Sequence, residues 1–195
     1  MQHNPDSWMQ AIETQELRVR EETEKLLGMH RDQKPRKIED YTLQTKNGPA
    51  KLSSFFNGKN ELILIHNMGK KCIYCTTWAD GINGFTGHMM DRSSLLLVSG
   101  DDVATQTEFA TSRGWKFPMA STKGITLFKD LGFQGEHKDG TAGDYPGVSI
   151  ILKDDKGQLW QKTAGRFGPG DLFCSIWNFF GLLPSQTDWQ PKYKY

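Results

Sequence analysis

The sequence predicts an α/β fold, with a central mixed β-sheet flanked by helices and one extra helix at the N-terminus. Two apolar runs, 62–65 and 95–99, are each followed by a helical segment, which is the pattern of parallel strands joined by right-handed crossovers. Two further strands, 148–152 and 159–163, flank the turn sequence 154–157 and predict an antiparallel hairpin. Parallel and antiparallel strands are therefore expected in one sheet.

Composition indicates a globular protein with one main domain. The 195 residues are 36% hydrophobic and 24% charged, enough for one core with additional elements. A formal net charge of +1 gives no broad attraction to nucleic acid or to an anionic membrane. No apolar run approaches the roughly 20 residues of a membrane span, and residues 1–6 lack the features of a secretory signal. We expect a cytoplasmic protein that binds neither nucleic acid nor membrane.

The N-terminal segment predicts a long helix of mixed charge. Residues 6–33 carry a sparse apolar stripe among many acidic and basic side chains, so the helix should pack by one face. That face is a candidate surface for a homodimer. We divide the chain into a helical arm and linker over 1–40, a sheet-containing domain over 41–184 and a polar tail over 185–195.

Shorter signals predict the elements between the main strands. The expected elements are a strand at 41–45, a turn at Asn47 and Gly48, a helical turn at 52–56, a helix at 103–113, a strand at 115–120 and a helix at 128–133. Thr105 and Glu108 form a capping pattern for the helix at 103–113. Residues 134–144 are polar and rich in glycine, which predicts a mobile loop.

Two helices carry distinctive signals. Gly81, Gly84 and Gly87 fall within the helix that follows the strand at 62–65. Because glycine is costly in a helix, by about 1 kcal/mol relative to alanine, this spacing predicts either a kink or a closely packed neighbour. The last helix is expected over 172–183, with Asp171 as its cap.

A Cys-x-x-Cys pair follows the apolar strand at 62–65. Cys72 and Cys75 come after a short turn that contains Gly69, where a helix should begin. Side chains three residues apart lie on one face of a helix, so the two sulfur atoms are close enough to bridge. A strand, a turn and a dithiol at a helix start are how thioredoxin-like proteins present reactive sulfur. The sequence therefore predicts a thioredoxin-like fold with a redox-active disulfide.

Lys70 and Lys71 directly precede Cys72, and their charge favours a reactive thiolate. A cation about 7 Å away stabilises the thiolate by roughly 1 kcal/mol at an effective dielectric constant of about 40. The helix N-terminus adds about 0.3–1 kcal/mol. Both effects lower the pKa of Cys72 below the ordinary thiol value of about 8.5. Because Cys75 lies one turn further in, we expect Cys72 to attack and Cys75 to resolve.

Other side chains near the dithiol admit more than one role. Tyr74 could contact a substrate, and Trp78 could flank the thiols or belong to the core. Asp80 could accept the proton of Cys75 or serve in packing. Three more residues are expected to be structural: His66 in the core, Arg166 on the surface and Cys174 buried on the last helix.

Alternative interpretations of the two cysteines remain. A purely structural disulfide would close a loop of only four residues and add roughly 2 kcal/mol of stability. A zinc site completed by His66, His88 or Cys174 lacks a second Cys-x-x-Cys or His pair. The cysteines could also be incidental. Haem attachment is excluded because Thr76, not histidine, follows the pair.

Several motifs along the chain are shared with one known family. They are Asp40-Tyr41, Leu52-x-x-Phe55-Phe56-x-Gly58, Leu64-Ile65-His66-x-Met68, Cys72-x-x-Cys75-Thr-x-Trp78-Ala79-Asp80-Gly81, Arg113-Gly114-Trp115-x-Phe117-Pro118 and Pro146-Gly147-Val148-Ser149. On these motifs residues 8–184 resemble the bacterial thioredoxin-like family called domain of unknown function eight-nine-nine. The resemblance implies a fold more firmly than an activity. The loop from Asn67 to Lys71 is shorter than is usual in that family.

We interpret the chain as a thiol–disulfide oxidoreductase that cycles Cys72 and Cys75 between dithiol and disulfide. Its substrate would be a protein or small-molecule disulfide or thiol, with an unidentified reductant and with neither cofactor nor metal. Two alternatives remain. One is a thiol peroxidase-like variant, although the Pro-x-x-x-Thr-x-x-Cys pattern of peroxiredoxins is absent. The other is a non-catalytic interaction module on the same fold.

Overall fold

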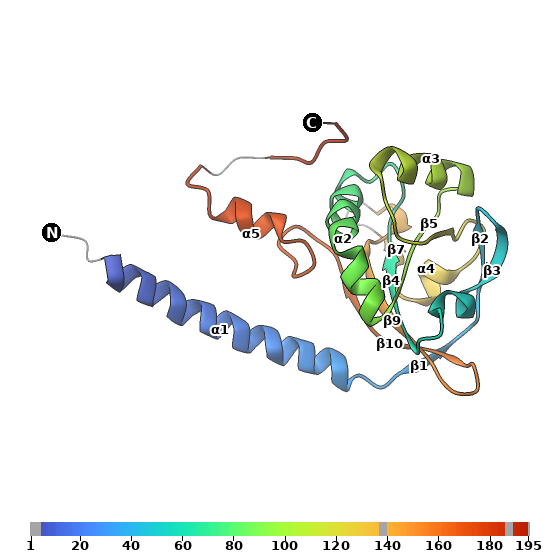
Figure 1. Cartoon of the computed structure of the whole chain (residues 1–195), viewed down its shortest axis with the longest axis horizontal. Helices are drawn as coiled ribbons and strands as arrows, with labels where there is room; N and C mark the ends of the chain where they lie inside the picture. The colour runs from blue at the N-terminus through green and yellow to red at the C-terminus, as the bar shows by residue number, and fades with distance from the viewer. Residues whose placement is uncertain (1–4, 137–139, 186–188, 195) are drawn as a thin grey trace.

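A mixed sheet forms the centre of the protein, as predicted. A computed structural model of the chain describes residues 5–136, 140–185 and 189–194. Its eight-stranded sheet has the order β1-β10-β9-β4-β5-β6-β2-β3 (Figure 1). The β4–β5 and β5–β6 pairs are parallel, and the other five pairs are antiparallel. The strands are β1 Arg36–Ile38, β2 Thr42–Thr45, β3 Gly48–Lys51, β4 Glu61–His66, β5 Ser94–Ser99, β6 Met119–Ser121, β9 Gly147–Lys153 and β10 Leu159–Arg166.

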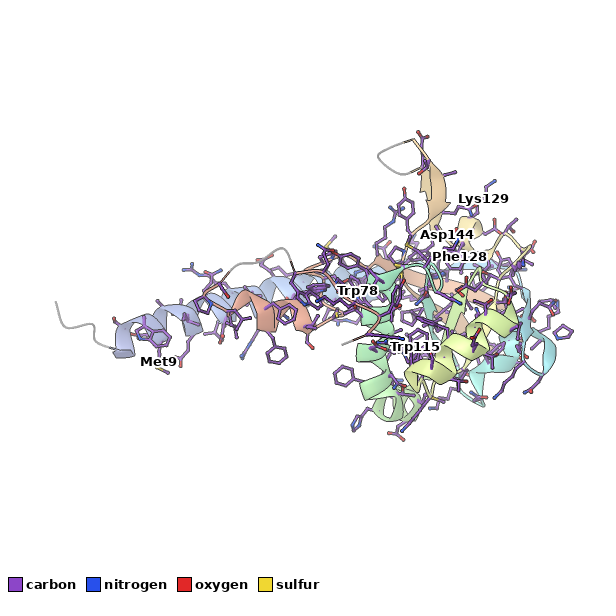
Figure 2. All side chains as sticks on the ribbon, turned by 90° about the horizontal axis from the view of Figure 1, so that it is seen from above. Met9, Trp78, Trp115, Phe128, Lys129 and Asp144 are labelled. Atoms are coloured by element: carbon purple, nitrogen blue, oxygen red, sulfur yellow. A yellow bond between two sulfur atoms is a disulfide. The ribbon has the colours of Figure 1, made fainter. Side chains whose placement is uncertain are left out.

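Helices cover the sheet, and one helix leaves it. The helices are α1 Pro5–Asp32, the 3-10 helix η1 Leu52–Phe56, α2 Ile73–Arg92, α3 Val103–Arg113, α4 Leu127–Asp130 and α5 Ile176–Gly181. In Figure 1, α2 lies against the sheet while α1 projects away from it as a long arm. Figure 2 shows the same arm from above, with Met9 near its far end. The mixed sheet with flanking helices and an extra N-terminal helix is confirmed.

The two faces of the sheet bury different side chains because successive strand residues point to opposite faces. Leu62 and Leu64 of β4 belong to one core cluster, which also contains η1 and α4 residues. Ile65 of β4 and Leu97 of β5 belong to the second cluster, which packs against α2. The first cluster is mainly aliphatic, whereas the second contains Trp78 and several other aromatic side chains. The strand β4, which precedes the cysteine pair, therefore contributes side chains to both cores.

Two edges of the sheet were not predicted as strands. The linker before residue 41 forms β1, which pairs with β10 at the register Lys37 to Trp160. Residues after the Asn47 turn form β3, which pairs with β2. Each is a strand of three or four residues, too short to show a periodic pattern in the sequence. Pairing with a neighbouring strand, rather than local pattern, determines both.

The segment 134–144 differs from the expected mobile loop. β7 Gln134–Glu136 and β8 Ala142–Asp144 pair as a small antiparallel sheet, with residues 137–139 outside the described chain. The expectation was wrong because a glycine-rich composition does not reveal a pairing partner six to ten residues away. Gln134 donates a side-chain hydrogen bond of 2.9 Å to Asp144, which links the two strands.

The N-terminal caps of two helices differ from those expected. Asp102, rather than Thr105, caps α3, because its carboxylate accepts the Thr105 amide at 2.8 Å. The final helix runs only over Ile176–Gly181, and Asp171 does not cap it. Asp171 instead accepts the backbone N–H groups of Gly168 and Phe173 in the preceding turn, each at 2.8 Å.

The glycines of α2 do not have the expected consequence. α2 is one continuous helix from Ile73 to Arg92. A Cβ atom added at Gly81, Gly84 or Gly87 would meet nothing within 4 Å. The predicted close neighbour is therefore absent from the described residues, and that explanation was wrong. The structure provides no steric reason for these three glycines.

Candidate functional site

The cysteine pair forms a disulfide at the N-terminus of α2. Cys72 and Cys75 are bonded, with their Cα atoms 5.2 Å apart. Cys72 is the N-cap residue of α2, and its sulfur accepts the Cys75 backbone N–H at 3.1 Å. Cys75 is only 2% exposed, whereas Cys72 is half-buried. Cys72 is therefore the more accessible sulfur, and it is the one that a helix N-terminal N–H would stabilise as a thiolate.

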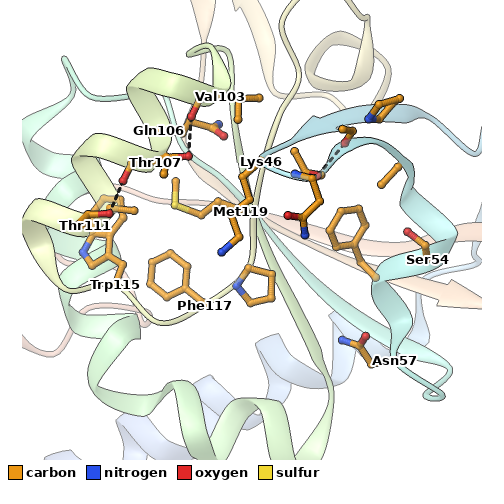
Figure 3. A pocket seen from close by; sticks show the side chains of 18 residues that line it. Lys46, Ser54, Asn57, Val103, Gln106, Thr107, Thr111, Trp115, Phe117 and Met119 are labelled. Carbon is orange, nitrogen blue, oxygen red and sulfur yellow. Dashed lines mark hydrogen bonds between the residues drawn. The ribbon is translucent and has the colours of Figure 1, made fainter.

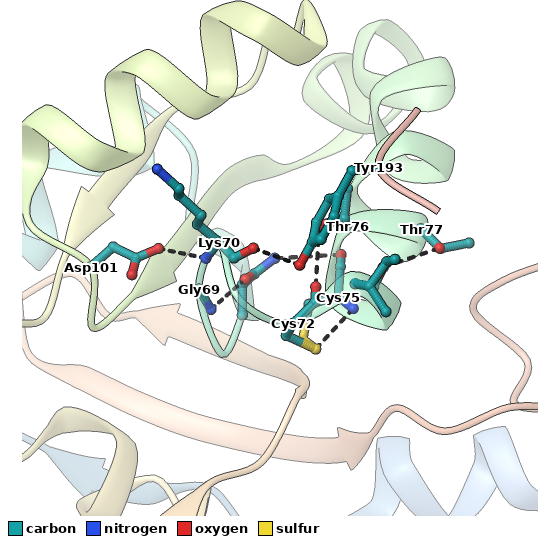
Figure 4. The surroundings of a disulfide bond; sticks show 10 residues. Gly69, Lys70, Cys72, Cys75, Thr76, Thr77, Asp101 and Tyr193 are labelled. Carbon is teal, nitrogen blue, oxygen red and sulfur yellow. Dashed lines mark hydrogen bonds between the residues drawn. A yellow bond between two sulfur atoms is a disulfide. The ribbon is translucent and has the colours of Figure 1, made fainter. Parts of the chain in front are cut away.

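The turn that leads into the disulfide is held by side chains from two strand ends. Asn67, which follows β4, accepts the Gly69 N–H at 2.7 Å. Asp101, which follows β5, accepts the Lys70 N–H at 2.6 Å (Figure 4). Gly69 has φ +95°, and a Cβ atom there would lie 2.7 Å from the Asp101 carboxylate. Glycine is thus required at position 69 on both conformational and steric grounds.

Lys70 and Lys71 lie in the turn that leads into Cys72. Lys70 and Lys71 are both exposed. Figure 4 shows the Lys70 side chain directed away from the disulfide. The fixed charged group at the turn is the Asp101 carboxylate, which binds the Lys70 backbone rather than its ammonium group. The hydrogen bond that reaches the Cys72 sulfur comes from the Cys75 backbone N–H at 3.1 Å, and the effect of the lysine charges stays a prediction.

Aromatic side chains pack together around the first turns of α2. Trp78 is 2% exposed, and its ring stacks on Phe167 with centroids 5.8 Å apart and planes at 3°. The Trp78 indole N–H donates to Asp171 at 2.9 Å. Tyr74, between the two cysteines, is half-buried and tilts against Trp78 and Trp177 at about 6 Å. Trp78 thus belongs to the second core cluster and also supports Tyr74.

Asp80 is engaged away from the sulfur atoms. Its carboxylate forms an ion pair with Arg113 and also accepts the Trp115 indole N–H at 2.8 Å. These contacts join α2 to the end of α3 and to the segment that follows it. Both carboxylate oxygens of Asp80 are thus engaged by Arg113 and Trp115, so the geometry favours its role in packing over proton transfer.

His66 is sealed in the core. It is 0% exposed, stacks on Phe133 with centroids 3.8 Å apart, and shares a 2.9 Å hydrogen bond between Nε2 and the Ser149 hydroxyl. Gln161 donates to the same hydroxyl at 3.0 Å. Nδ1 has no hydrogen-bond partner among the described residues. Burial lowers the pKa of His66 to about 3, so the imidazole is neutral at physiological pH.

The remaining two candidates lie where a structural role would place them. Arg166 is exposed, with its guanidinium 4.0 Å from the centre of the Tyr145 ring. Cys174 is a free thiol, 6% exposed, and burial raises its pKa. A buried thiol with a raised pKa is a poor nucleophile. Within the described ranges, no group of three His, Cys, Asp or Glu side chains could hold a metal ion.

A separate cavity lies at the other edge of the sheet. It has a volume of about 500 Å³ and is enclosed by the β2–β3 hairpin and α3 (Figure 3). Lys46, Thr107, Trp115 and Phe117 are among its lining residues, whereas neither bonded cysteine lines it. This cavity is therefore not part of the disulfide site.

Sequence reasoning missed three residues around the disulfide. A signal for Asp101 was available, because it follows β5, whose carboxyl end lies beside that of the parallel strand β4. The sequence Gly100-Asp101-Asp102 was interpreted only as the end of a strand. Asn67 directly follows β4 and could have been found in the same way. Tyr193 had no local signal, since its hydroxyl donates to the carbonyl of Lys70, 123 residues away.

The family model named Bacterial protein of unknown function (DUF899) matches residues 4–188. The chain belongs to this family. None of the curated proteins compared with the chain matches it. No helix within the described ranges is long and apolar enough to cross a membrane. Family membership covers the arm, the sheet and α5 in one match.

Solved structures with a similar fold are peroxiredoxins. A cysteine-to-serine mutant of Xylella fastidiosa PrxQ is 17% identical, with a TM-score of 0.60, over 75% of this chain and 94% of that chain. The Xanthomonas campestris bacterioferritin comigratory protein is 19% identical, with a TM-score of 0.56, over 76% and 94%. Peroxidoxin BcpB from Mycobacterium tuberculosis is 19% identical, with a TM-score of 0.52, over 65% and 82%. These likenesses establish the thioredoxin-like fold.

Proposed function

We propose that the protein is a thiol–disulfide oxidoreductase whose working group is the Cys72–Cys75 pair. The observation that carries the proposal is the disulfide itself: two sulfurs one turn apart at a helix N-terminus, with Cys72 more accessible than Cys75. A disulfide across four residues adds little stability, roughly 2 kcal/mol, so a structural role alone explains it poorly. Reversible thiol–disulfide exchange uses both features of the pair: two sulfurs close enough to bond, and one of them accessible to a substrate.

The reaction consumes one disulfide and forms another. In the reduced protein, the Cys72 thiolate attacks one sulfur of the substrate, and the other substrate sulfur leaves as a thiolate that takes up a proton. The Cys75 thiol then loses its proton and attacks the Cys72 sulfur, which releases the second substrate thiol. Each turnover oxidises one protein dithiol and reduces one substrate disulfide. A dithiol reductant must afterwards reduce the Cys72–Cys75 bond.

Supporting roles follow from the geometry. The Cys75 N–H and the start of α2 stabilise the Cys72 thiolate. The Tyr74 ring is positioned to contact a substrate at the cysteine pair, and Trp78 packs against that ring. Lys70 and Lys71 contribute mobile positive charge near the exposed side of the turn. Asp80 supports the site indirectly through its ion pair with Arg113.

Insulin reduction with dithiothreitol tests the proposal. Wild type should accelerate the precipitation of insulin chains, and Cys72→Ser should abolish the acceleration. Cys75→Ser should form a mixed disulfide with the substrate, detectable by mass spectrometry, because the resolving step is lost. Cys174→Ser is the matched control and should behave as wild type. Activity that survives Cys72→Ser, or alkylation of Cys75 before Cys72 at pH 6.5, would contradict the assignment.

A thiol peroxidase is the second candidate, favoured by the identity of the structural neighbours. The description of the Xanthomonas campestris protein refers to alkyl peroxide reduction. In this chain, the Cys72 thiolate would attack a peroxide oxygen, giving a sulfenic acid and an alcohol or water, and Cys75 would then close the disulfide with loss of water. Stopped-flow oxidation of reduced protein by hydrogen peroxide separates the candidates. Rapid loss of the Cys72 thiol would favour the peroxidase.

The arm gives grounds for a homodimer. Ile12, Val19 and Leu26 recur every seven residues on α1 and are 49%, 54% and 43% exposed. Apolar side chains that repeat every seven residues line one face of a helix, and such a face can form the seam between two paired helices. We propose that two copies pair through this seam.

We also propose that the protein works in the cytoplasm, on protein or small-molecule disulfides. In this proposal, residues 41–184 form the catalytic domain, residues 1–40 the arm with its linker and residues 185–195 the tail.

A further inference from the structure

We infer that the face of α2 and α3 beside the disulfide binds an extended polypeptide segment, and that the chain's own residues 189–194 occupy this face. The inference rests on the proposed exchange function and names its substrate class: an extended segment of an oxidised protein that carries an aromatic side chain. From the sequence, residues 185–195 were expected only to form a polar tail. The structure places residues 189–194 across the site, although they belong to no helix or strand.

The first anchor of the segment is an aromatic ring. The Tyr193 hydroxyl donates a 2.9 Å hydrogen bond to the backbone carbonyl of Lys70, two residues before Cys72 (Figure 4). The Tyr193 ring meets Phe109 of α3 edge to face, with centroids 6.1 Å apart. The ring is thus held at the entrance to the disulfide turn.

The second set of anchors recognises an extended chain. Arg113 donates to the Tyr193 backbone carbonyl at 2.6 Å, a contact that any residue could make. The Tyr74 hydroxyl donates to the Gln190 side-chain carbonyl. Pro191, between these contacts, is buried. A guanidinium on a main-chain carbonyl, a phenol on an amide and an apolar contact form a general polypeptide-binding surface.

The far end of the segment packs on α5. Trp189 meets Trp177 with ring centroids 6.0 Å apart and Phe180 with centroids 4.8 Å apart. The segment therefore runs from an aromatic cluster on α5 to the disulfide turn. Tyr74, which lies between the two cysteines in the sequence, is also beneath this path. A polypeptide substrate that places its disulfide at Cys72 must compete for the same groups.

Tethering explains how weak anchors can hold the segment. A ligand joined to its site by a short linker experiences an effective concentration in the millimolar range. A free polypeptide substrate must displace it, whereas a small disulfide can reach Cys72 without using the Phe109 and Arg113 contacts. Weakening the segment should therefore affect polypeptide and small substrates differently.

The test compares two substrates in full-length variants. Tyr193→Ala removes the hydroxyl and the ring contact, and Lys194→Ala changes the adjacent exposed residue as a matched control. We expect Tyr193→Ala to reduce insulin about five-fold faster than wild type, the effect of losing one anchoring hydrogen bond. Reduction of dithiobis(nitrobenzoate) by the pre-reduced proteins, after removal of dithiothreitol, should change less than two-fold. Lys194→Ala should match wild type with both substrates.

A binding measurement makes the inference independent of turnover. A fluorescein-labelled peptide, Trp-Gln-Pro-Lys-Tyr-Lys, should bind Tyr193→Ala more tightly than wild type by anisotropy, while a scrambled peptide should not. The inference is overturned if this peptide binds neither protein, or if Tyr193→Ala changes both disulfide reactions equally. If wild type does not reduce insulin faster than dithiothreitol alone, the exchange proposal fails, and the anisotropy result alone decides whether the surface exists.

Discussion

The two longest helices of the chain, α1 with 28 residues and α2 with 20, are held in opposite ways. α2 buries Trp78 and Ile82 against the sheet and carries the disulfide at its N-terminus. α1 leaves most of its apolar side chains in solvent, including Trp8 at 54% and Met29 at 64% exposed. Near its end, His30 makes a 2.7 Å hydrogen bond to Thr163 of β10.

The difference shows that the tendency of a segment to form a helix and the packing of that helix have separate causes. α2 contains three glycines, each unfavourable by about 1 kcal/mol relative to alanine, yet it lies on the core. α1 is rich in Glu, Arg and Leu, which favour helices, yet this chain supplies it with little to pack on. Local preference forms α1, whereas burial of one face stabilises α2. Most apolar side chains of α1 are therefore left exposed, whereas Trp78 and Ile82 of α2 are buried on the sheet.

The largest expected effect comes from a substitution that disrupts the packing of α2. Trp78→Ala should lower the free energy of unfolding by about 3–5 kcal/mol, since it opens a cavity beside Phe167 and removes the hydrogen bond to Asp171. Trp8→Ala on the exposed arm is the matched control and should change stability by less than about 0.5 kcal/mol. Urea unfolding followed by circular dichroism measures both. Equal losses would contradict the comparison.

The next effect tests the strand that leads into α2. His66 has a pKa of about 3 when folded and about 6.5 when unfolded. Between these values the unfolded chain binds more protons, so stability is complete above pH 6.5 and falls as the pH decreases towards 3. The expected loss is about 2–3 kcal/mol from pH 6.5 to 4.5. His66→Gln should flatten this dependence in urea unfolding at several pH values.

His88, which is exposed on α2, provides the control for the pH experiment. His88→Gln should keep the pH dependence of wild type. A wild-type stability that stays constant from pH 6.5 to 4.5 would show that His66 is not buried as a neutral side chain.

A smaller effect concerns the turn before α2. Gly69→Ala should cost about 1–3 kcal/mol, because φ is +95° and the new methyl group would meet Asp101. Gly48→Ala, at φ +97° with no atom within 4 Å, isolates the backbone contribution. The difference between the two variants in thermal unfolding reports the steric contact with Asp101. If Gly48→Ala cost as much, that contact would be unimportant.

The smallest effect on the folded domain comes from the arm. Ile12→Glu with Val19→Glu should leave the unfolding free energy of the domain within about 0.5 kcal/mol of wild type, because both side chains are exposed. The same double variant should abolish the proposed dimer in sedimentation equilibrium. Glu13→Lys, a charge change beside the seam, should not. A monomeric wild type would rule out the pairing of two arms.

Local patterns in the sequence determined much of this protein. Apolar runs predicted β4 and β5, periodicity predicted α1 and α3, and the Cys-x-x-Cys spacing placed the disulfide at the start of α2. These features depend on residues a few positions apart, so the sequence contains the whole signal.

Only the tertiary structure decided which distant groups meet around the sulfurs. Asp101 reaches the Lys70 amide, Arg113 takes the Asp80 carboxylate, and Tyr193 crosses to the Lys70 carbonyl. The pairing of the edge strand β1 with β10 was decided in the same way. Such contacts join residues 30 to 120 positions apart, and their energy comes from burial and pairing that no local pattern records.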